Sequence, residues 1–206
     1  MEQLGEPFMA MKSSDAPVMF IDATHPTHNS KPAYGWIRKG TRAEIPANSG
    51  RQRLNLHGAV NAETYEVLMT ENEKMTGESA LELFRKIENQ YQDAQDIYVI
   101  LDRAPYYGCK TVKEYCRQSR IRLVYLPSYS PNLNIIEQLW RFMNEQVINN
   151  RFYQTFREFR VEPLCFFDRL SKDSGESKEF FDDLHSRLAV NFSIASDKET
   201  HRQVVV

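Results

Sequence analysis

Three short, mostly apolar runs constrain the fold of this chain more strongly than any other feature of its sequence. They are Val18–Ile21, Ile97–Leu101 and Ile121–Leu126. Runs of this length suit strands that are buried on both faces, as the central strands of parallel and mixed sheets are. None approaches the roughly 20 apolar residues that a membrane-spanning helix needs, so no membrane partner is expected.

The segments between these runs carry two other periodicities. Residues 54–60 and 65–69 alternate apolar and polar side chains around a polar turn at Asn61-Ala62, which predicts a hairpin. Residues 77–91 instead repeat apolar side chains at intervals of three and four, which predicts an amphipathic helix capped by Thr76. Strands and helices that alternate after a hairpin indicate an α/β fold, with a mixed sheet flanked by helices. Further predicted elements are an alternating segment over 33–38, helices over 2–12, 108–118, 136–147 and 180–188, and a helix over 152–170 that breaks near Pro163.

Charge is distributed unevenly along the chain. Its 26 lysines and arginines against 28 aspartates and glutamates give a net charge of −2, which excludes a dedicated DNA-binding module. Residues 31–53 nevertheless carry a net charge of +5, and this segment is open to two interpretations, a solvated loop or a local patch that binds phosphate. The three cysteines fit neither a disulfide framework nor a zinc pattern, so we expect a reducing, cytoplasmic environment.

Three carboxylates stand at the ends of predicted elements, where neighbouring strands of such a sheet converge on a crevice. Asp22 follows the first apolar run, Asp102 ends the second, and Glu137 lies near the start of the strongest predicted helix. Each also has a purely structural interpretation. Asp22 suits a cap on the loop that follows it, and Asp102 suits a tight turn. Glu137 has capping-box spacing from Asn134, so only the three carboxylates together favour a functional site.

Five short motifs occur in an order that resembles a known family. They are Asp22-Ala-Thr-His25-Pro-Thr-His28, Tyr34-Gly-Trp36, Gly50-Arg-Gln-Arg53, Leu101-Asp-Arg-Ala104 and Leu126-Pro-Ser-Tyr-Ser-Pro-Asn-Leu-Asn-Ile-Ile-Glu137-Gln-Leu-Trp140. Over roughly residues 15–160 the chain resembles the catalytic domain of mariner-superfamily insertion-sequence transposases, and the last motif is the most specific. The fold that this resemblance implies is RNase H-like, in agreement with the predicted mixed sheet.

The resemblance implies a DDE triad of Asp22, Asp102 and Glu137 as catalytic and metal-binding residues. The 34 residues between Asp102 and Glu137 match the spacing that the resemblance implies. Phosphodiester cleavage and strand transfer are in-line displacements at phosphorus, which two divalent ions about 3.5–4 Å apart can assist. Carboxylate oxygens suit Mg²⁺ or Mn²⁺, so we expect two such ions, bridged by Asp22 and held individually by the other two carboxylates.

Residues near this triad define further candidates. The family usually has Asn where this chain has Arg103, and often His at the position of Tyr107. Arg103 either pairs with Asp102 and competes with metal, or points outward and binds a phosphate. His25 and His28 are predicted to lie near the site, holding the loop or contacting DNA, rather than to bind zinc. With DNA expected at the triad, the basic segment is predicted to bind phosphate through Arg38, Lys39, Arg51 and Arg53.

The chain is expected to divide into three parts. Residues 1–14 form the remnant of an upstream linker helix, residues 15–170 an RNase H-like DDE catalytic domain, and residues 171–206 a C-terminal helix and tail. No helix-turn-helix pattern precedes residue 15, so we expect a DNA transposition enzyme without the region that recognises element ends. The alternative is a non-catalytic DNA-binding or subunit-association remnant, which acts as a homodimer or in a complex with an intact transposase.

Overall fold

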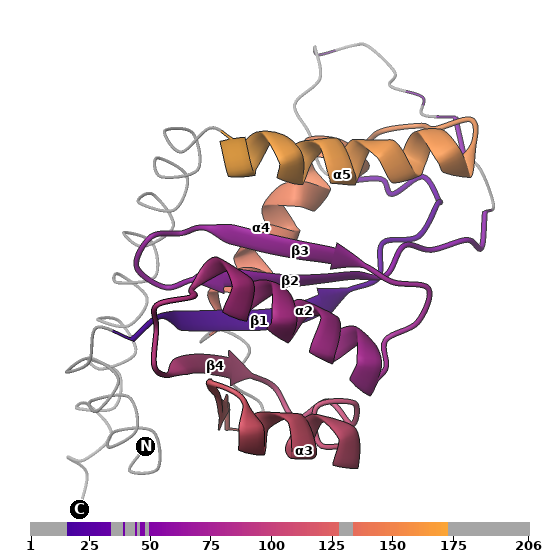
Figure 1. Cartoon of the computed structure of the whole chain (residues 1–206). Helices are drawn as coiled ribbons and strands as arrows, with labels where there is room; N and C mark the ends of the chain where they lie inside the picture. The colour runs from indigo at the N-terminus through magenta and orange to yellow at the C-terminus, as the bar shows by residue number, and fades with distance from the viewer. Residues whose placement is uncertain are drawn as a thin grey trace, which may run out of the picture.

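A five-stranded mixed sheet forms the centre of the computed structural model, which describes residues 16–33, 39, 44, 46–47, 50–127 and 134–172 (Figure 1). The strands are β1 (Val18–Thr24), β2 (Leu56–Asn61), β3 (Val67–Glu71), β4 (Ile97–Leu101) and β5 (Ile121–Tyr125). Their order across the sheet is β3-β2-β1-β4-β5. The β1–β2 and β2–β3 pairs are antiparallel, and the β1–β4 and β4–β5 pairs are parallel. The predicted mixed sheet and its hairpin are therefore confirmed.

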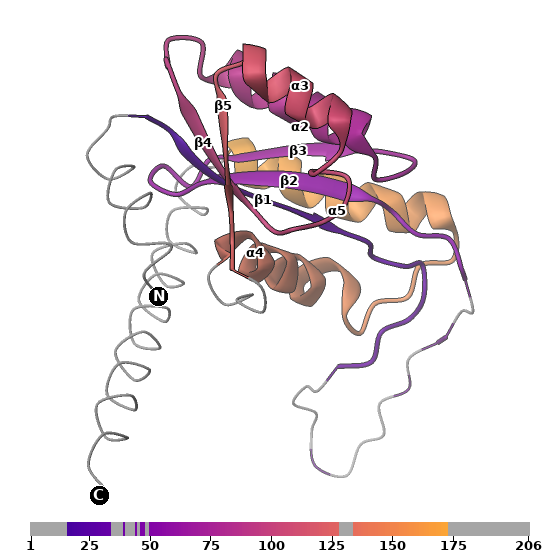
Figure 2. The same cartoon turned by 90° about the horizontal axis from the view of Figure 1, so that it is seen from below.

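Helices cover both faces of this sheet (Figure 2). On one face lie α2 (Gly77–Gln90) and α3 (Lys110–Gln118). On the other face lie α4 (Ile135–Met143), the π-helical turn η2 (Asn144–Ile148) that continues it, and α5 (Phe156–Lys172). The predicted cap of α2 is present, because the Thr76 hydroxyl accepts a hydrogen bond from the backbone N–H of Ser79 at 3.3 Å.

Each helical layer buries its own apolar cluster against the sheet. Ile21 of β1 and Ala59 of β2 belong to the cluster under α2 and α3. Leu56 and Val60 of β2 belong to the cluster under α4 and α5. Because side chains alternate between the two faces of a strand, Asp22 is directed to the face that α4 covers.

Three predicted boundaries differ from the structure. β1 does not end at Ile21, because its antiparallel pairing with β2 continues to Thr24. The helix predicted over 136–147 begins as α4 but ends as the π-helical η2. α5 runs through Pro163 without the predicted break, although a proline removes one helical hydrogen bond. Buried aromatic side chains before and after this proline pack α5 onto the rest of the cluster and hold it in one piece: Phe159, Phe166 and Phe167.

Several predicted segments lie outside the described residues. They are the helices over 2–12 and 180–188, most of the alternating segment over 33–38, and nearly all of the predicted N-terminal and C-terminal parts. Within the described ranges, no helix combines the length and apolarity that crossing a membrane requires.

Arg120 joins the end of α2 to the start of β5. Its Nη1 donates hydrogen bonds to the carbonyl oxygens of Tyr91, Gln92 and Ala94 at 2.7–2.9 Å, and its Nη2 donates one to that of Glu88. The Glu88 carboxylate in turn accepts a hydrogen bond from the Arg120 backbone N–H at 2.9 Å. The end of a helix leaves its last carbonyls without helical partners, and this guanidinium satisfies one of them in α2, that of Glu88, together with three in the cap and turn that follow.

Replacing Arg120 by Lys should lower the free energy of unfolding by about 2 kcal/mol, because an ammonium group cannot serve four carbonyls as the planar guanidinium does. Urea unfolding followed by circular dichroism measures this loss. Arg117→Lys is the matched control, since Arg117 is exposed in the last turn of α3 and its replacement should change stability by less than about 0.5 kcal/mol. Equal losses in the two variants would contradict the role given to Arg120.

Candidate active site

Asp22 lies inside β1, on the face of the sheet that α4 covers. Its Oδ2 accepts a hydrogen bond from the indole Nε1–H of Trp140 at 3.0 Å. Burial raises the pKa of the Asp22 carboxyl from 3.8 to about 6, and the charges of Asp102 and Glu137 add to this rise. Hydrogen bonds from the Ala23 backbone and from Trp140 oppose the rise in pKa. Asp22 is thus a half-buried strand residue, not the cap of a loop.

Asp102 follows β4 directly, as predicted, and the register of the sheet brings it beside Asp22. Phe20 of β1 pairs in parallel with Ile100 of β4, and the two aspartates each lie two residues further along. Residues two apart on a strand share a face, so this register places both carboxylates on the α4 side. Asp102 is exposed, and its Oδ1 accepts a hydrogen bond from the Ala104 N–H at 3.0 Å. The tight turn that was the structural interpretation of Asp102 is therefore present as well.

Glu137 occupies the first turn of α4, and the start of this helix is tied to β1. Asn134 caps the helix by accepting a hydrogen bond from a backbone N–H of the first turn, and its Nδ2 donates to the Ile21 carbonyl at 3.3 Å. The Glu137 carboxylate makes no hydrogen bond within the described part of the chain, so Asn134 alone forms the cap. Burial raises the pKa of Glu137, the charge of Arg141 opposes this rise, and that of Asp102 adds to it.

The three carboxylates repel one another electrostatically. The charge of Asp102 raises the pKa of both Asp22 and Glu137, and the charge of Glu137 raises that of Asp22. Carboxylates in this situation tend to keep a proton until a cation neutralises them. Across the ranges that the structure describes, no three His, Cys, Asp or Glu side chains converge closely enough to form a ready-made metal cluster. The carboxylates of β1, of the residue after β4 and of α4 therefore influence one another electrostatically without forming a cluster among the described residues.

A buried polar pair that has no sequence signal lies on the opposite face of the sheet from these aspartates, under α2 and α3. The Nε2 of His57 lies 2.7 Å from the Tyr107 hydroxyl, and both side chains are fully buried. Burial lowers the pKa of His57 to about 4, so the ring is neutral at pH 7. The ring of Tyr106 packs on that of Tyr107 with 4.4 Å between centroids. Burial raises the pKa of Tyr106 to about 12, and the charges of Asp102 and Asp22 add to this rise. In sequence His57 occupies a polar position of the alternating segment 54–60, which gives no signal of this buried contact.

The two predicted histidines lie in the loop after β1 and join it to the segment before β2. The backbone N–H of His28 donates to the Gln52 carbonyl at 2.8 Å. The Nδ1 of His25 lies 2.9 Å from Asn55 Oδ1. His28 is buried, with its Nε2 2.8 Å from the Tyr153 carbonyl oxygen. These contacts suit the loop-holding role of the histidines, and the buried ring of His28 is not placed to touch DNA.

The predicted phosphate-binding residues stand beside this loop where the structure describes them. Arg51 and Arg53 are exposed in the segment before β2, and Arg53 pairs with Thr27 in an isolated β-bridge. Lys39 is exposed as well, whereas Arg38 lies outside the described residues. Cations are thus available on the segment that borders the loop after Asp22.

Arg103 follows Asp102 and is exposed. Among the described residues its guanidinium forms no ion pair with Asp102. Burial raises the pKa of Tyr125, and the charge of Arg103 opposes this rise. Both predicted roles of Arg103 stay predictions.

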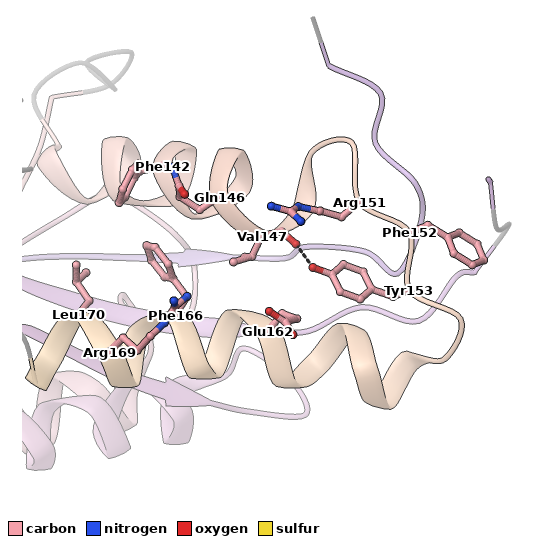
Figure 3. A pocket seen from close by; sticks show the side chains of 10 residues that line it. All are labelled: Phe142, Gln146, Val147, Arg151, Phe152, Tyr153, Glu162, Phe166, Arg169 and Leu170. Atoms are coloured by element: carbon pink, nitrogen blue, oxygen red, sulfur yellow. Dashed lines mark hydrogen bonds between the residues drawn. The ribbon is translucent and has the colours of Figure 1, made fainter. Parts of the chain in front are cut away.

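A groove of about 410 Å³ lies apart from the carboxylates, between α4–η2 and α5 (Figure 3). None of Asp22, Asp102 and Glu137 lines it. Its lining includes four aromatic residues and two arginines: Phe142, Phe152, Tyr153, Phe166, Arg151 and Arg169. The groove is therefore not part of the candidate active site.

Comparisons with known proteins agree with this arrangement. Residues 17–160 match the model of the DDE superfamily endonuclease family. The insertion element IS630 uncharacterized 39 kDa protein of Shigella sonnei is 22% identical over 139 residues, which cover 67% of this chain and 40% of that protein. The uncharacterized protein y4pE/y4sA of Sinorhizobium fredii (strain NBRC 101917 / NGR234) is 29% identical over 93 residues, which cover 45% of this chain and 67% of that protein.

Solved structures share the fold at low sequence identity. A pre-cleavage Mos1 transpososome matches with a TM-score of 0.68 and 15% identity, over 95% of this chain and 60% of that chain. The Mos1 transposase paired-end complex with the left transposon end matches with a TM-score of 0.66 and 14% identity, over 91% of this chain and 57% of that chain. The five-stranded mixed sheet with helices on both faces is an RNase H-like fold. The chain belongs to the DDE superfamily endonucleases, whose family model matches most of its length.

Removing the charge of Asp22 should stabilise the metal-free protein at neutral pH. Because its pKa is about 6 when folded against an ordinary 3.8, its contribution to stability is full below about pH 4 and is lost as pH rises through about 6. In EDTA, the free energy of unfolding of Asp22→Asn should exceed that of the wild type by up to about 3 kcal/mol at pH 7. Near pH 3.5 the two free energies should be equal. Urea unfolding at both pH values measures the difference. A variant no more stable than the wild type at pH 7 would contradict the burial of this charge.

Proposed function

We propose that this chain is the metal-dependent catalytic domain of a transposase, which cleaves and rejoins DNA phosphodiester bonds with Asp22, Asp102 and Glu137. One observation supports the proposal most: in a chain of the DDE superfamily endonucleases, the charge of Asp102 raises the pKa of both Asp22 and Glu137. Perturbed carboxylates that gather at strand ends are typical of catalytic sites. The chain spans 40% of the Shigella sonnei relative and about 60% of the Mos1 chains, so the activity of a whole transposase is part of this proposal.

The donor set fits Mg²⁺ or Mn²⁺, because both ions prefer carboxylate oxygens. Trp140 and the Ala23 backbone donate hydrogen bonds to the Asp22 carboxylate, and Ala104 donates one to Asp102, and a carboxylate has about four lone-pair sites, so each can also bind a cation. In the proposal Asp22, Asp102 and Glu137 would together hold the ions. When bound, such ions supply activation of the attacking oxygen and stabilisation of the leaving oxygen. Support also comes from Mos1 complexes of the same fold that were solved with Mn and with Mg.

In this proposal, a cation that binds at the carboxylates would replace a proton held by Asp22. With a pKa of about 6, Asp22 holds a proton in part of the metal-free molecules near neutral pH. A cation that binds there displaces this proton, so binding should release protons and strengthen as pH rises from 6 to 8.

DNA would approach along the loop after β1 and the segment before β2. There Arg51, Arg53 and Lys39 are exposed, and we propose Arg38 and Arg103 as further phosphate contacts. Phosphate contacts position a duplex without reading its sequence, so binding by this chain alone should be weak and non-specific.

Mg²⁺ or Mn²⁺ should raise the unfolding temperature of the wild type, because a ligand that binds only the folded protein stabilises it, by about 2.7 kcal/mol at 100 times the Kd. Asp102→Asn should abolish this shift while the amide oxygen still accepts the Ala104 hydrogen bond. Asp93→Asn, on the exposed turn after α2, is the control and should keep the shift. Differential scanning calorimetry measures all three.

Nicking of supercoiled plasmid in Mn²⁺ then tests the chemistry with the same proteins. Wild type and Asp93→Asn should nick, and Asp102→Asn should not. A metal-induced shift that persists in Asp102→Asn would locate the ions elsewhere. No shift and no nicking in the wild type would favour the non-catalytic DNA-binding remnant.

Replacing Arg51 and Arg53 by Ala should weaken DNA binding to all sequences alike. Each phosphate contact releases about one counterion, so the slope of log affinity against log salt should fall by about 2. Fluorescence anisotropy with two unrelated duplexes at several salt concentrations measures both effects. Lys113→Ala/Arg117→Ala removes two exposed cations from α3 and should leave the slope unchanged. A larger loss of slope in this control pair would move the DNA path to α3.

A further inference from the structure

Trp140 joins the helix that carries Glu137 to the strand that carries Asp22. It lies one helical turn after Glu137 in α4, and its Nε1–H donates to Asp22 Oδ2 at 3.0 Å. The side chain is buried in the cluster under α4 and α5, where its ring packs edge-on against Phe167 with 5.8 Å between centroids. Packing therefore fixes the apolar part of the indole, and its one polar atom meets the carboxylate.

Gly58 makes room for this contact. It pairs with Asp22 across the β1–β2 ladder. A Cβ atom at position 58 would lie 2.6 Å from Trp140 Cη2 and 3.1 Å from Ile136 Cδ1. Non-bonded carbon atoms pack best at about 3.5–4.0 Å, so any side chain here would displace the indole or the helix. The bare backbone at Gly58 lets α4 lie directly on the sheet, within hydrogen-bond reach of Asp22.

We propose that Trp140 is a positioning residue for the active site: it orients the Asp22 carboxylate and couples it to Glu137 through α4, with Gly58 as the recess that permits the contact. An indole only donates, so the bond to Oδ2 has one direction and restricts the orientation of the carboxylate. Groups that orient a metal-binding carboxylate commonly change metal affinity when they are lost. The proposal rests on the metal-dependent function proposed above.

Trp140→Phe keeps an aromatic ring and removes the donor. We expect the Mn²⁺ affinity measured by titration calorimetry to fall 10-fold to 100-fold, with an unchanged circular dichroism spectrum. Phe167→Leu is the control, because it removes a ring from the same cluster without touching Asp22. It should lower the unfolding temperature and leave Mn²⁺ affinity within about twofold. Wild-type affinity in Trp140→Phe, or an equal loss in Phe167→Leu, would overturn the proposal.

Gly58→Ala tests whether the space beside Gly58 is needed for the Trp140 ring. This variant remains informative if Trp140→Phe does not fold. Alone, it should weaken Mn²⁺ binding about as much as loss of the donor, because the added Cβ displaces the indole. In the Trp140→Phe background it should weaken binding little further, since the bond is already absent and Cη2 does not exist in phenylalanine. Fully additive losses, or no loss in Gly58→Ala, would overturn the proposal.

A metal-free measurement separates this proposal from the proposed function. The indole N–H resonance of Trp140, assigned by its loss in Trp140→Phe, should shift in Asp22→Ala and stay in place in Glu145→Ala, which changes an exposed carboxylate of η2. A resonance unmoved by Asp22→Ala overturns the contact with Asp22. If the resonance shifts in Asp22→Ala but the wild type binds no Mn²⁺, the contact between Trp140 and Asp22 is supported and the metal-dependent function is overturned instead.

Discussion

Asp22 brings a carboxylate into the interface between a sheet and a helix, and the free-energy cost of burying that charge underlies the chemistry proposed for this protein. Burial and the charges of Asp102 and Glu137 disfavour the anion, whereas the Ala23 backbone and the Trp140 indole favour it. The result is a carboxyl with a pKa of about 6, balanced between holding a proton and binding a cation. A cation at this place would remove the repulsion that the metal-free protein has to accommodate.

Three supports from different parts of the chain maintain this balance. The parallel pairing of Phe20 with Ile100 sets Asp22 and Asp102 side by side. The Asn134 amide ties the start of α4 to the Ile21 carbonyl and so brings Glu137 to the same place. The antiparallel partner β2 contributes glycine where the helix approaches most closely. Together these three contacts explain why residues from β1, the end of β4 and α4 interact electrostatically.

The sequence predicts the sheet well, because buried central strands are short apolar runs and the hairpin alternates with a period of two. It misplaces the end of β1, since a carboxylate interrupts the apolar run and only the pairing with β2 shows that the strand continues through Asp22. Trp140 is recognisable as a core residue of an amphipathic helix, but no local pattern reveals that its N–H meets a carboxylate 118 residues away. The contact of His57 with Tyr107 is hidden for the same reason, because it joins two elements that no periodicity relates.

A crystal structure of the protein soaked in Mn²⁺, with anomalous scattering data, tests most directly whether Asp22, Asp102 and Glu137 form one cation-binding centre. The carboxylate arrangement predicts two anomalous peaks about 3.5–4 Å apart, one within bonding distance of Asp102 and one of Glu137, with Asp22 touching both. In Asp22→Asn crystals grown and soaked in the same way, at least one peak should vanish. Strong peaks that avoid all three carboxylates, or no peak at saturating Mn²⁺, would contradict the existence of this centre.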